Sequence, residues 1–305
     1  MRAGEVVGVS ANVLSRILGL SDHGLLPPGT SVMELGTQQL HCRGSEAFLG
    51  EFVSRIAAKN PRLQNASGIP SHEIKEMAQG GFLSKLLKAC GYQYAALDIF
   101  EADDTILFDL NRQEPPAEMR NNYDLVTNFG TTEHIVNQYL AFKTMHELTK
   151  LGGIMFHELP LSGFHTHGYF SYNPLLFNQL AEANQYEVVM QAYSKNHIDF
   201  VAAPDYMRSN GYPDPGYYDY GIQFIFRKTA DAAFRIPLET STSLDVSPLF
   251  LNNLADGLAM ADLDVSYGST GRGRGDLSKH TGREIQHELL KRYKARVLRM
   301  LKGQK

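Results

Sequence analysis

The chain has 305 residues, of which 43% are hydrophobic and 20% charged, and a net charge of −4. These values are ordinary for a globular protein, and the acidic balance argues against nucleic acid as a partner. Two cysteines are too few for a disulfide framework, and no apolar run approaches the roughly 20 residues of a membrane span. Without a signal-peptide pattern at the N-terminus, we expect a cytoplasmic protein.

Hydrophobic periodicity predicts alternating strands and helices between residues 31 and 230, preceded by an N-terminal helical segment at 1–30. A helix at 10–20 opens the chain, and Ser45 is a candidate N-cap for a later one. Strands separated by helices are typical of a mostly parallel α/β sheet covered on both faces, and the last two strands could form an antiparallel edge pair. The predicted strands are 31–35, 94–99, 105–110, 123–128, 153–158, 186–193 and 222–227, and the helices between them are 45–58, 82–89, 133–151 and 174–184.

Acidic side chains lie at the predicted ends of three successive strands. Glu34 precedes Gly36 at the first turn, Asp98 ends the second strand, and Asp109 lies near the end of the third. In such sheets ligands bind at the carboxyl ends of the strands, where a carboxylate can accept hydrogen bonds from ribose hydroxyls or an adenine amino group. Each acid by itself could equally be a loop residue or helix cap. The ordered set predicts a site for a positively charged nucleoside rather than a pyrophosphate, which prefers glycines and helix N-termini.

The motifs resemble, in order, those of the class I S-adenosylmethionine-dependent methyltransferases over roughly residues 30–230. The matching segments are 32–36, 97–100, 107–111, 123–134 and 151–155, and residues 163–170 followed by Asn173-Pro174 resemble bacterial small-molecule and sugar methyltransferases. The resemblance implies a Rossmann-like, doubly wound sheet of seven strands with an antiparallel edge strand, and S-adenosyl-L-methionine as cofactor. It implies cofactor contacts at Glu34, Gly36, Thr37, Gln38, Asp98, Ile99, Asp109, Leu110, Asn128, Phe129 and Gly130.

Two features depart from the family pattern. The first turn continues with Thr37 and Gln38 where further glycines are expected, so these side chains would meet the carboxylate of the cofactor. Glu34 and Asp98 are about 64 positions apart, whereas roughly 20 are expected between the glycine turn and the acidic residue of a nucleotide-binding unit. We therefore predict a helical insertion near residues 60–92 that caps the active site.

Histidines are the candidate general bases, because an oxygen nucleophile must lose a proton near neutral pH. We favour His165 and His167, with His134 as the third candidate; each could instead orient its loop or line the cofactor site. His165 and His167 could also ligate a metal with Glu158, but hard divalent ions prefer oxygen ligands, and we expect no metal. The predicted substrate-binding residues are His157, Glu158, Tyr169 and Tyr217.

Residues 231–305 leave the alternating pattern and end in a basic amphipathic helix. From Arg272 onward, the sequence contains eleven basic and three acidic residues, and the spacing of its leucines and Tyr293 predicts an apolar helix face. This helix could pack on its own domain, pair with a second subunit in a homodimer, or make weak contact with an anionic membrane surface.

The expected function is transfer of a methyl group from S-adenosylmethionine to a small-molecule acceptor, to an oxygen of a sugar or secondary metabolite. Two alternatives stay open. The low glycine content of the first turn motivates a non-catalytic S-adenosylmethionine-binding protein. An enzyme that uses the same cofactor for other chemistry, such as cyclisation, is the other.

Overall fold

The computed structural model describes residues 8–61, 63, 69–102, 104–164, 167–195, 199–202 and 219–237. The expected C-terminal helix, and with it the predicted dimer and membrane contacts, lies outside the described residues. The same is true of His165 and Tyr217. Among the helices of the described ranges, none is long and apolar enough to cross a membrane.

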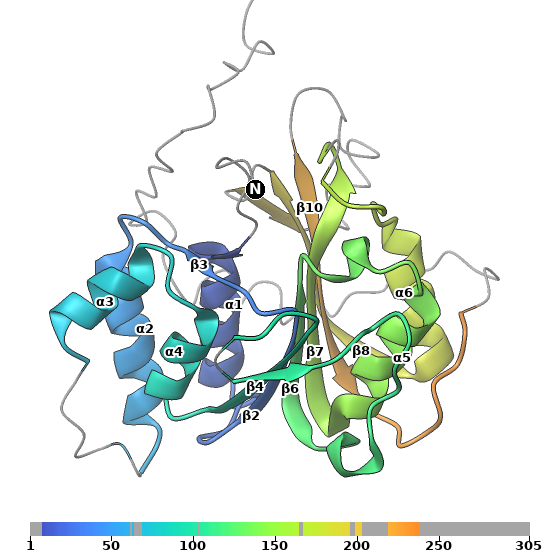
Figure 1. Ribbon diagram of the computed structural model, residues 1–305, viewed down its shortest axis with the longest axis horizontal. Helices are drawn as coiled ribbons and strands as arrows, with labels where there is room; N and C mark the ends of the chain where they lie inside the picture. Colours follow the sequence, from blue (N-terminus) through green and yellow to red (C-terminus); the bar gives the residue numbers. More distant parts are fainter. Residues whose placement is uncertain are drawn as a thin grey trace, which may run out of the picture. The chain divides into compact units, whose positions relative to one another are not determined.

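A mixed eight-stranded sheet forms the centre of the described region (Figure 1). Its strands are β2 (Ser31–Leu35), β4 (Gln93–Asp98), β5 (Thr105–Leu107), β6 (Tyr123–Phe129), β7 (Thr149–Ser162), β8 (Tyr186–Lys195), β9 (Asp199–Ala202) and β10 (Tyr220–Lys228), in the order β5-β4-β2-β6-β7-β10-β8-β9. The first five strands in this order are parallel, and β10 is antiparallel to both of its neighbours. The predicted Rossmann-like sheet of seven strands is confirmed, and β9 adds a short antiparallel edge strand.

The last two predicted strands do pair antiparallel, but β10 lies inside the sheet between β7 and β8. Almost every residue of β10 is buried, including Phe224 and Phe226. Such continuous burial suits a strand covered on both faces better than an edge strand. The antiparallel strand at this edge of the sheet is therefore β9.

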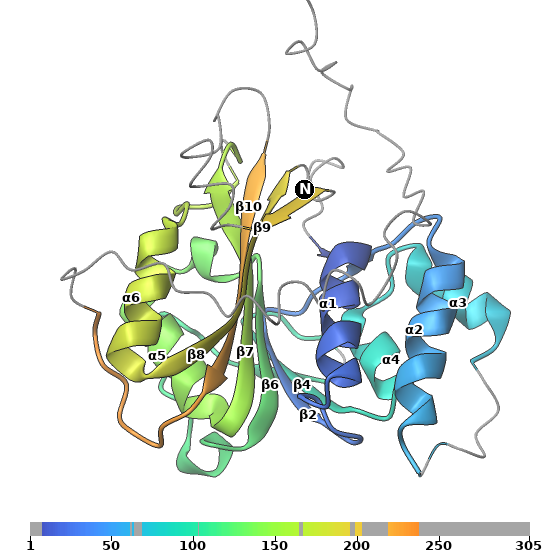
Figure 2. The same ribbon diagram turned by 180° about the vertical axis from the view of Figure 1, so that it is seen from behind.

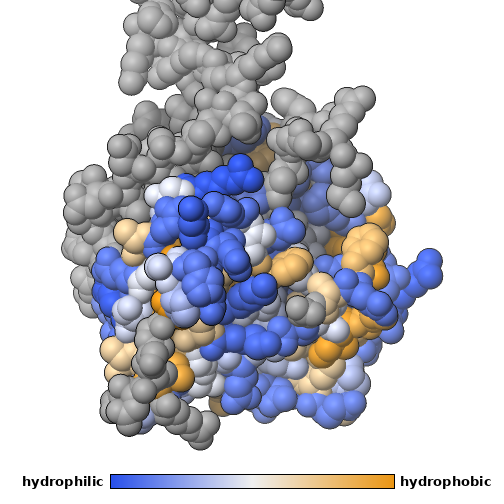
Figure 3. Space-filling model, turned by 60° about the vertical axis from the view of Figure 1, so that its left-hand side comes forward, coloured by the Kyte–Doolittle hydropathy of each residue, from blue (hydrophilic) through white to orange (hydrophobic). Residues whose placement is uncertain are grey.

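Helices cover both faces of the sheet, as Figures 1 and 2 show. One face carries α1 (Ala11–Asp22), α2 (Glu46–Ala58), α3 (Ser71–Ala78) and α4 (Leu83–Ala89), and the other carries α5 (Gln138–Leu148) and α6 (Pro174–Asn184). Successive residues of β2 point to opposite faces, so Val32 packs in the first core cluster and Met33 in the second. A separate parallel pair, β1 (Val9–Ser10) and β3 (Leu40–His41), joins the start of α1 to the chain after β2. On the face shown in Figure 3, hydrophilic residues predominate.

The predicted insertion is helical and consists of α3 and α4. Ile74, Met77 and Leu86 pack in the same core cluster as α1 and α2. The chain between the two helices also touches the first turn, since Leu40 N–H donates to Gly81 O and Leu83 N–H to Gln38 O. The insertion thus covers the sheet and supports the turn after β2, while its role as a cap stays a prediction.

Two helix starts differ from the expectation. The predicted helix at 133–151 begins only at Gln138, where the Asn137 side chain accepts a hydrogen bond from Leu140 N–H. A 3₁₀ turn occupies Thr132–His134 instead. Ser45 does stand at the start of α2, but its side chain makes no capping hydrogen bond.

Candidate functional site

The turn after β2 lies against the loop after β6. Gly36 has a φ of +74°, and its N–H donates to Leu97 O at 2.8 Å. Thr131 Oγ1 donates to Leu35 O at 2.5 Å and accepts from Gln38 Nε2 at 3.3 Å. These bonds join the two loops at the switch point between the neighbouring strands β2 and β6, the usual place for a ligand in this kind of sheet.

Glu34 supports this turn from within the core. Its side chain is fully buried, and its Oε2 accepts hydrogen bonds from Gln38 N–H at 3.2 Å and from the hydroxyl of Tyr94. Burial raises the pKa of Glu34 to about 8, although both hydrogen bonds act in the opposite direction. The buried side chain of Glu34 therefore supports the turn from the core. A cofactor would contact the turn itself and not the Glu34 carboxylate.

Asp98 ends β4 beside the same turn. Its Oδ2 accepts from Thr37 N–H at 2.8 Å and its Oδ1 from Phe100 N–H at 3.1 Å. Each carboxylate oxygen keeps a further lone pair that could accept a hydroxyl hydrogen. Next to it, the apolar side chains of Ile99 and Leu107 are exposed by 62% and 55%. The carboxylate is thus held in place at the edge of an exposed apolar surface.

Asp109 follows β5, and its Oδ1 accepts from Asn111 N–H at 2.9 Å. Leu110 is buried, so that only its backbone could meet a ligand. Asn111 in turn accepts hydrogen bonds from the N–H groups of Val136 and Asn137. The loop after β5 is therefore tied to the segment that precedes α5.

A buried polar network fixes the end of β6. Asn128 Nδ2 donates to Thr132 Oγ1 at 2.8 Å, and Thr132 N–H donates back to Asn128 Oδ1 at 3.1 Å. The Tyr172 hydroxyl lies 2.9 Å from both Thr132 Oγ1 and Gln138 Oε1. Because Asn128 is occupied in this network, its side chain holds the loop and does not face an open site.

His157 lies in the core, which corrects its assignment as a substrate-binding residue. It is only 2% exposed and packs against Phe142, Phe177 and Phe226. Burial lowers its pKa to about 3, and its Nδ1 lies 3.2 Å from Asn128 Nδ2. Side chains alternate along β7, so the inward position of His157 leaves the next residue, Glu158, to face the site.

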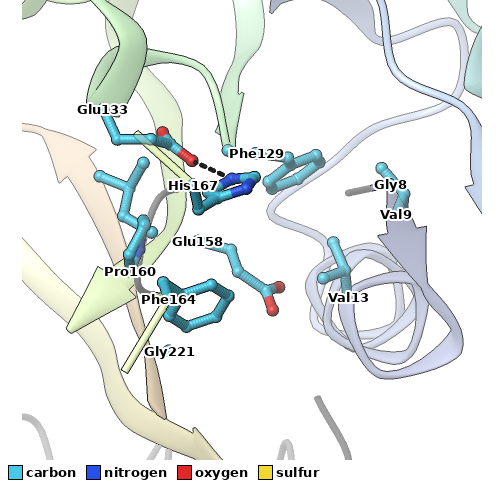
Figure 4. A pocket seen from close by; sticks show the side chains of 12 residues that line it. Gly8, Val9, Val13, Phe129, Glu133, Glu158, Pro160, Phe164, His167 and Gly221 are labelled. Carbon is cyan, nitrogen blue, oxygen red and sulfur yellow. Dashed lines mark ion pairs between the residues drawn. The ribbon is translucent and has the colours of Figure 1, made fainter. Parts of the chain in front are cut away.

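A pocket opens between the start of α1 and the ends of β6 and β7 (Figure 4). The Glu158 side chain points into it, and Gln223 Nε2 donates to Glu158 Oε2 at 2.8 Å. Burial lowers the pKa of Arg16 in α1 to about 10, while the negative charge of Glu158 acts in the opposite direction. The lining residues are Gly8, Val9, Val13, Phe129, Gly130, Glu133, Glu158, Leu159, Pro160, Phe164, His167 and Gly221.

Glu133 is joined at the pocket by two of the predicted histidines. His167 Nε2 lies 3.5 Å and His134 Nε2 3.9 Å from Glu133 Oε1, and the two imidazole rings are 5.0 Å apart. Figure 4 shows Glu133 and His167 pointing toward each other. Tyr169 is 74% exposed, although its N–H donates to Glu133 O at 2.8 Å.

The structure thus brings Phe129, Gly130, Glu158 and His167 together at one pocket, while the predicted nucleoside contacts line the neighbouring strand ends. Sequence reasoning missed Glu133, Arg16 and the α1 side of the pocket. Arg16 did carry a signal, because a charged residue between Val13 and Ile17 interrupts an apolar run. Nothing local distinguished Glu133 from a surface glutamate.

Residues 77–207 match a family model described as a methyltransferase domain. A comparison with curated proteins finds no match. Among solved structures, a Burkholderia thailandensis 1,6-didemethyltoxoflavin-N1-methyltransferase is similar with a TM-score of 0.40 and 12% identity, over 72% of this chain and 79% of that one. TehB from Haemophilus influenzae is similar with a TM-score of 0.39 and 14% identity, over 69% of this chain and 61% of that one. A putative sarcosine dimethylglycine methyltransferase from Galdieria sulphuraria is similar with a TM-score of 0.38 and 13% identity, over 70% of this chain and 85% of that one.

The family match covers β4 to β9 and begins after the turn at Gly36. It therefore includes Asp98, Asp109 and the loop after β6, and leaves the atypical turn outside. The predicted resemblance to methyltransferases is confirmed over residues 77–207, where the chain matches the family model of a methyltransferase domain.

Proposed function

We propose that the protein transfers a methyl group from S-adenosylmethionine to an oxygen of a small molecule. The observation that carries this proposal is the row of Gly36, Asp98 and Asp109 at the carboxyl ends of adjacent strands, two of them within the methyltransferase match. Ligands of open α/β sheets bind at this edge.

The side chains present fit the parts of this cofactor. Asp98 has acceptor capacity for the ribose hydroxyls, and the exposed Ile99 and Leu107 beside it offer apolar surface to an adenine ring. Gly130, with a φ of +70°, gives close backbone access at the pocket where the methionine part would lie. The cofactor, when bound, supplies a methyl group on a positively charged sulfur.

The residues around the pocket would orient the acceptor and keep water out. Phe129, Leu159 and Phe164 are apolar walls, and a dry site favours transfer to the acceptor over hydrolysis. Glu158 offers a carboxylate that can accept a hydrogen bond from an acceptor hydroxyl. The proton of that hydroxyl would pass to the imidazole of His134 or His167, two of the three histidines predicted as bases, which lie beside Glu133.

Calorimetric titration with S-adenosylmethionine and S-adenosylhomocysteine tests cofactor binding first. We expect saturable binding of both, followed by acceptor-dependent formation of S-adenosylhomocysteine in a panel of hydroxylated small molecules. No binding at millimolar ligand would overturn the proposal. Product analysis without an acceptor would reveal cyclisation or hydrolysis of the cofactor.

A second candidate is a binding protein that retains the fold without transfer. The contact between Thr131 and the turn at Gly36 favours it, because the Thr131 side chain fills space between the two loops where a cofactor would lie. Binding of S-adenosylhomocysteine with no turnover for any acceptor would support this candidate over the first.

A further inference from the structure

Glu133 carries a buried carboxylate that lacks ordinary hydrogen-bond donors. Its side chain is 1% exposed, and neither carboxylate oxygen has a hydrogen-bond partner among the described residues. The Nε2 atoms of His167 and His134 lie 3.5 and 3.9 Å from its Oε1, and these imidazoles carry a positive charge only when they are protonated. A buried carboxylate without donors is costly, and proteins retain one where a cation compensates it.

Two separate segments build this cluster. The 3₁₀ turn at Thr132–His134 supplies Glu133 and His134 and is held by the hydrogen bonds between Thr132 and Asn128. The chain after β7 supplies His167. It is clamped against the turn by the N–H groups of Tyr169 and Phe170, which donate to Glu133 O at 2.8 and 3.2 Å.

Gly168 permits this close approach. A Cβ at this position would lie 2.7 Å from Glu133 Cγ, so any larger residue would push the loop that carries His167 away. The fold therefore brings the carboxylate and both imidazoles close to one another.

We propose that Glu133, His134 and His167 bind a divalent transition-metal ion at the wall of the pocket. One ligand atom from each of the three side chains lies within 4.8 Å of the others. Metal bonds of about 2.0–2.2 Å to nitrogen and oxygen put the ligand atoms of one ion roughly 3–4 Å apart, so small side-chain rotations suffice.

The ligand set selects the class of metal. Two imidazoles and one carboxylate suit zinc, iron or cobalt, whereas magnesium and calcium prefer oxygen ligands. The set differs from the one considered from the sequence, because Glu133 takes the place of Glu158. Three protein ligands leave a coordination position open, and His167 and Glu133 both line the pocket into which it would face.

The role of the metal rests on the proposed function. An ion at this wall would hold an oxygen of the acceptor and lower the pKa of its hydroxyl group. With the ion bound, His134 and His167 would serve as ligands, and the hydroxyl proton would pass instead to the carboxylate of Glu158, which lines the same pocket.

Cobalt(II) titration of the tag-free, chelator-treated full-length protein tests the site, because the visible absorption of cobalt reports its coordination. We expect one equivalent to bind with bands typical of nitrogen and oxygen ligands, and zinc to displace it. Glu133→Gln and His134→Gln should weaken binding by more than about 100-fold, beyond the usual effect of residues outside the ligand shell. His72→Gln, which replaces an exposed histidine on α3, should leave it unchanged.

His134 is 45% exposed, so its replacement should not disturb folding; thermal unfolding and circular dichroism check this for each variant. Absence of cobalt bands in the wild-type protein would overturn the proposal, and so would equal affinity in wild type and His134→Gln. S-adenosylhomocysteine titration of the same samples separates the two proposals. The protein can bind the metal without binding the cofactor, or bind the cofactor without binding the metal.

Discussion

A Cβ atom on Gly36 would lie 2.4 Å from Thr131 Oγ1. This distance is shorter than any normal contact, and Thr131 is itself held by its hydrogen bond to Leu35 O. The loops after β2 and β6 can therefore meet only because position 36 has no side chain.

Gly36→Ala should lower the free energy of unfolding by about 2–4 kcal/mol, from the cost of a left-handed alanine and the clash with Thr131. It should also abolish binding of S-adenosylhomocysteine. Gly29→Ala is the matched control, since Gly29 has a φ of +79° with no atom within 4 Å of the added Cβ, and should cost only about 1 kcal/mol. Urea denaturation measures both; equal losses would show that the contact with Thr131 is unimportant.

Asp98→Ala should weaken binding of S-adenosylhomocysteine by about 10- to 100-fold, because hydrogen bonds to a charged acceptor are lost. The control is Asp124→Ala at the opposite end of the parallel strands. Asp124 accepts hydrogen bonds from Ser31 and Lys150, so its loss should reduce stability without changing affinity. Calorimetry that finds unchanged affinity in Asp98→Ala would contradict the ribose assignment.

The raised pKa of Glu34 predicts a stability that declines with pH. The folded protein keeps Glu34 protonated up to about pH 8, whereas the unfolded chain ionises it above about pH 4.5. Its contribution is therefore fully present below pH 4.5 and is lost as the pH rises toward 8. Relative to wild type, Glu34→Gln should gain up to about 4 kcal/mol between pH 4.5 and 8, an upper bound.

Urea denaturation at several pH values measures this difference. Glu51→Gln is the control, because Glu51 is exposed and pairs only with Arg55 among the described residues, so its replacement should change the stability by less than about 1 kcal/mol. A pH-independent difference between Glu34→Gln and wild type would mean that Glu34 is ionised in the folded protein.

Lys228 anchors the far end of β10. Its buried ammonium donates to Asn121 Oδ1 at 2.9 Å, His146 O at 2.9 Å and Thr149 O at 3.0 Å. Lys228→Met leaves these three acceptors without their donor and should lower the free energy of unfolding by about 2–4 kcal/mol. The neighbouring Arg227→Met removes an exposed pair with Glu187 and should cost less than about 1 kcal/mol. Thermal unfolding compares the two, and similar losses would contradict the assigned role of Lys228.

Local sequence determined the elements and their order. The strand Ser31–Leu35 and the helix Pro174–Asn184 have the predicted bounds, because apolar periodicity and turn residues act over a few positions. Asp98 ends β4 as predicted, whereas β5 ends at Leu107 and not at Leu110, so that Asp109 lies just beyond its strand. These features require no knowledge of which strand pairs with which.

Tertiary structure decided which side chains share the pocket. The phase of β7 turns His157 into the core and Glu158 toward the pocket, and one strand's composition does not specify that phase. Glu133 and His167 are 34 positions apart and meet because Gly168 lets their loops touch. Such contacts depend on long-range packing, which only the folded chain supplies.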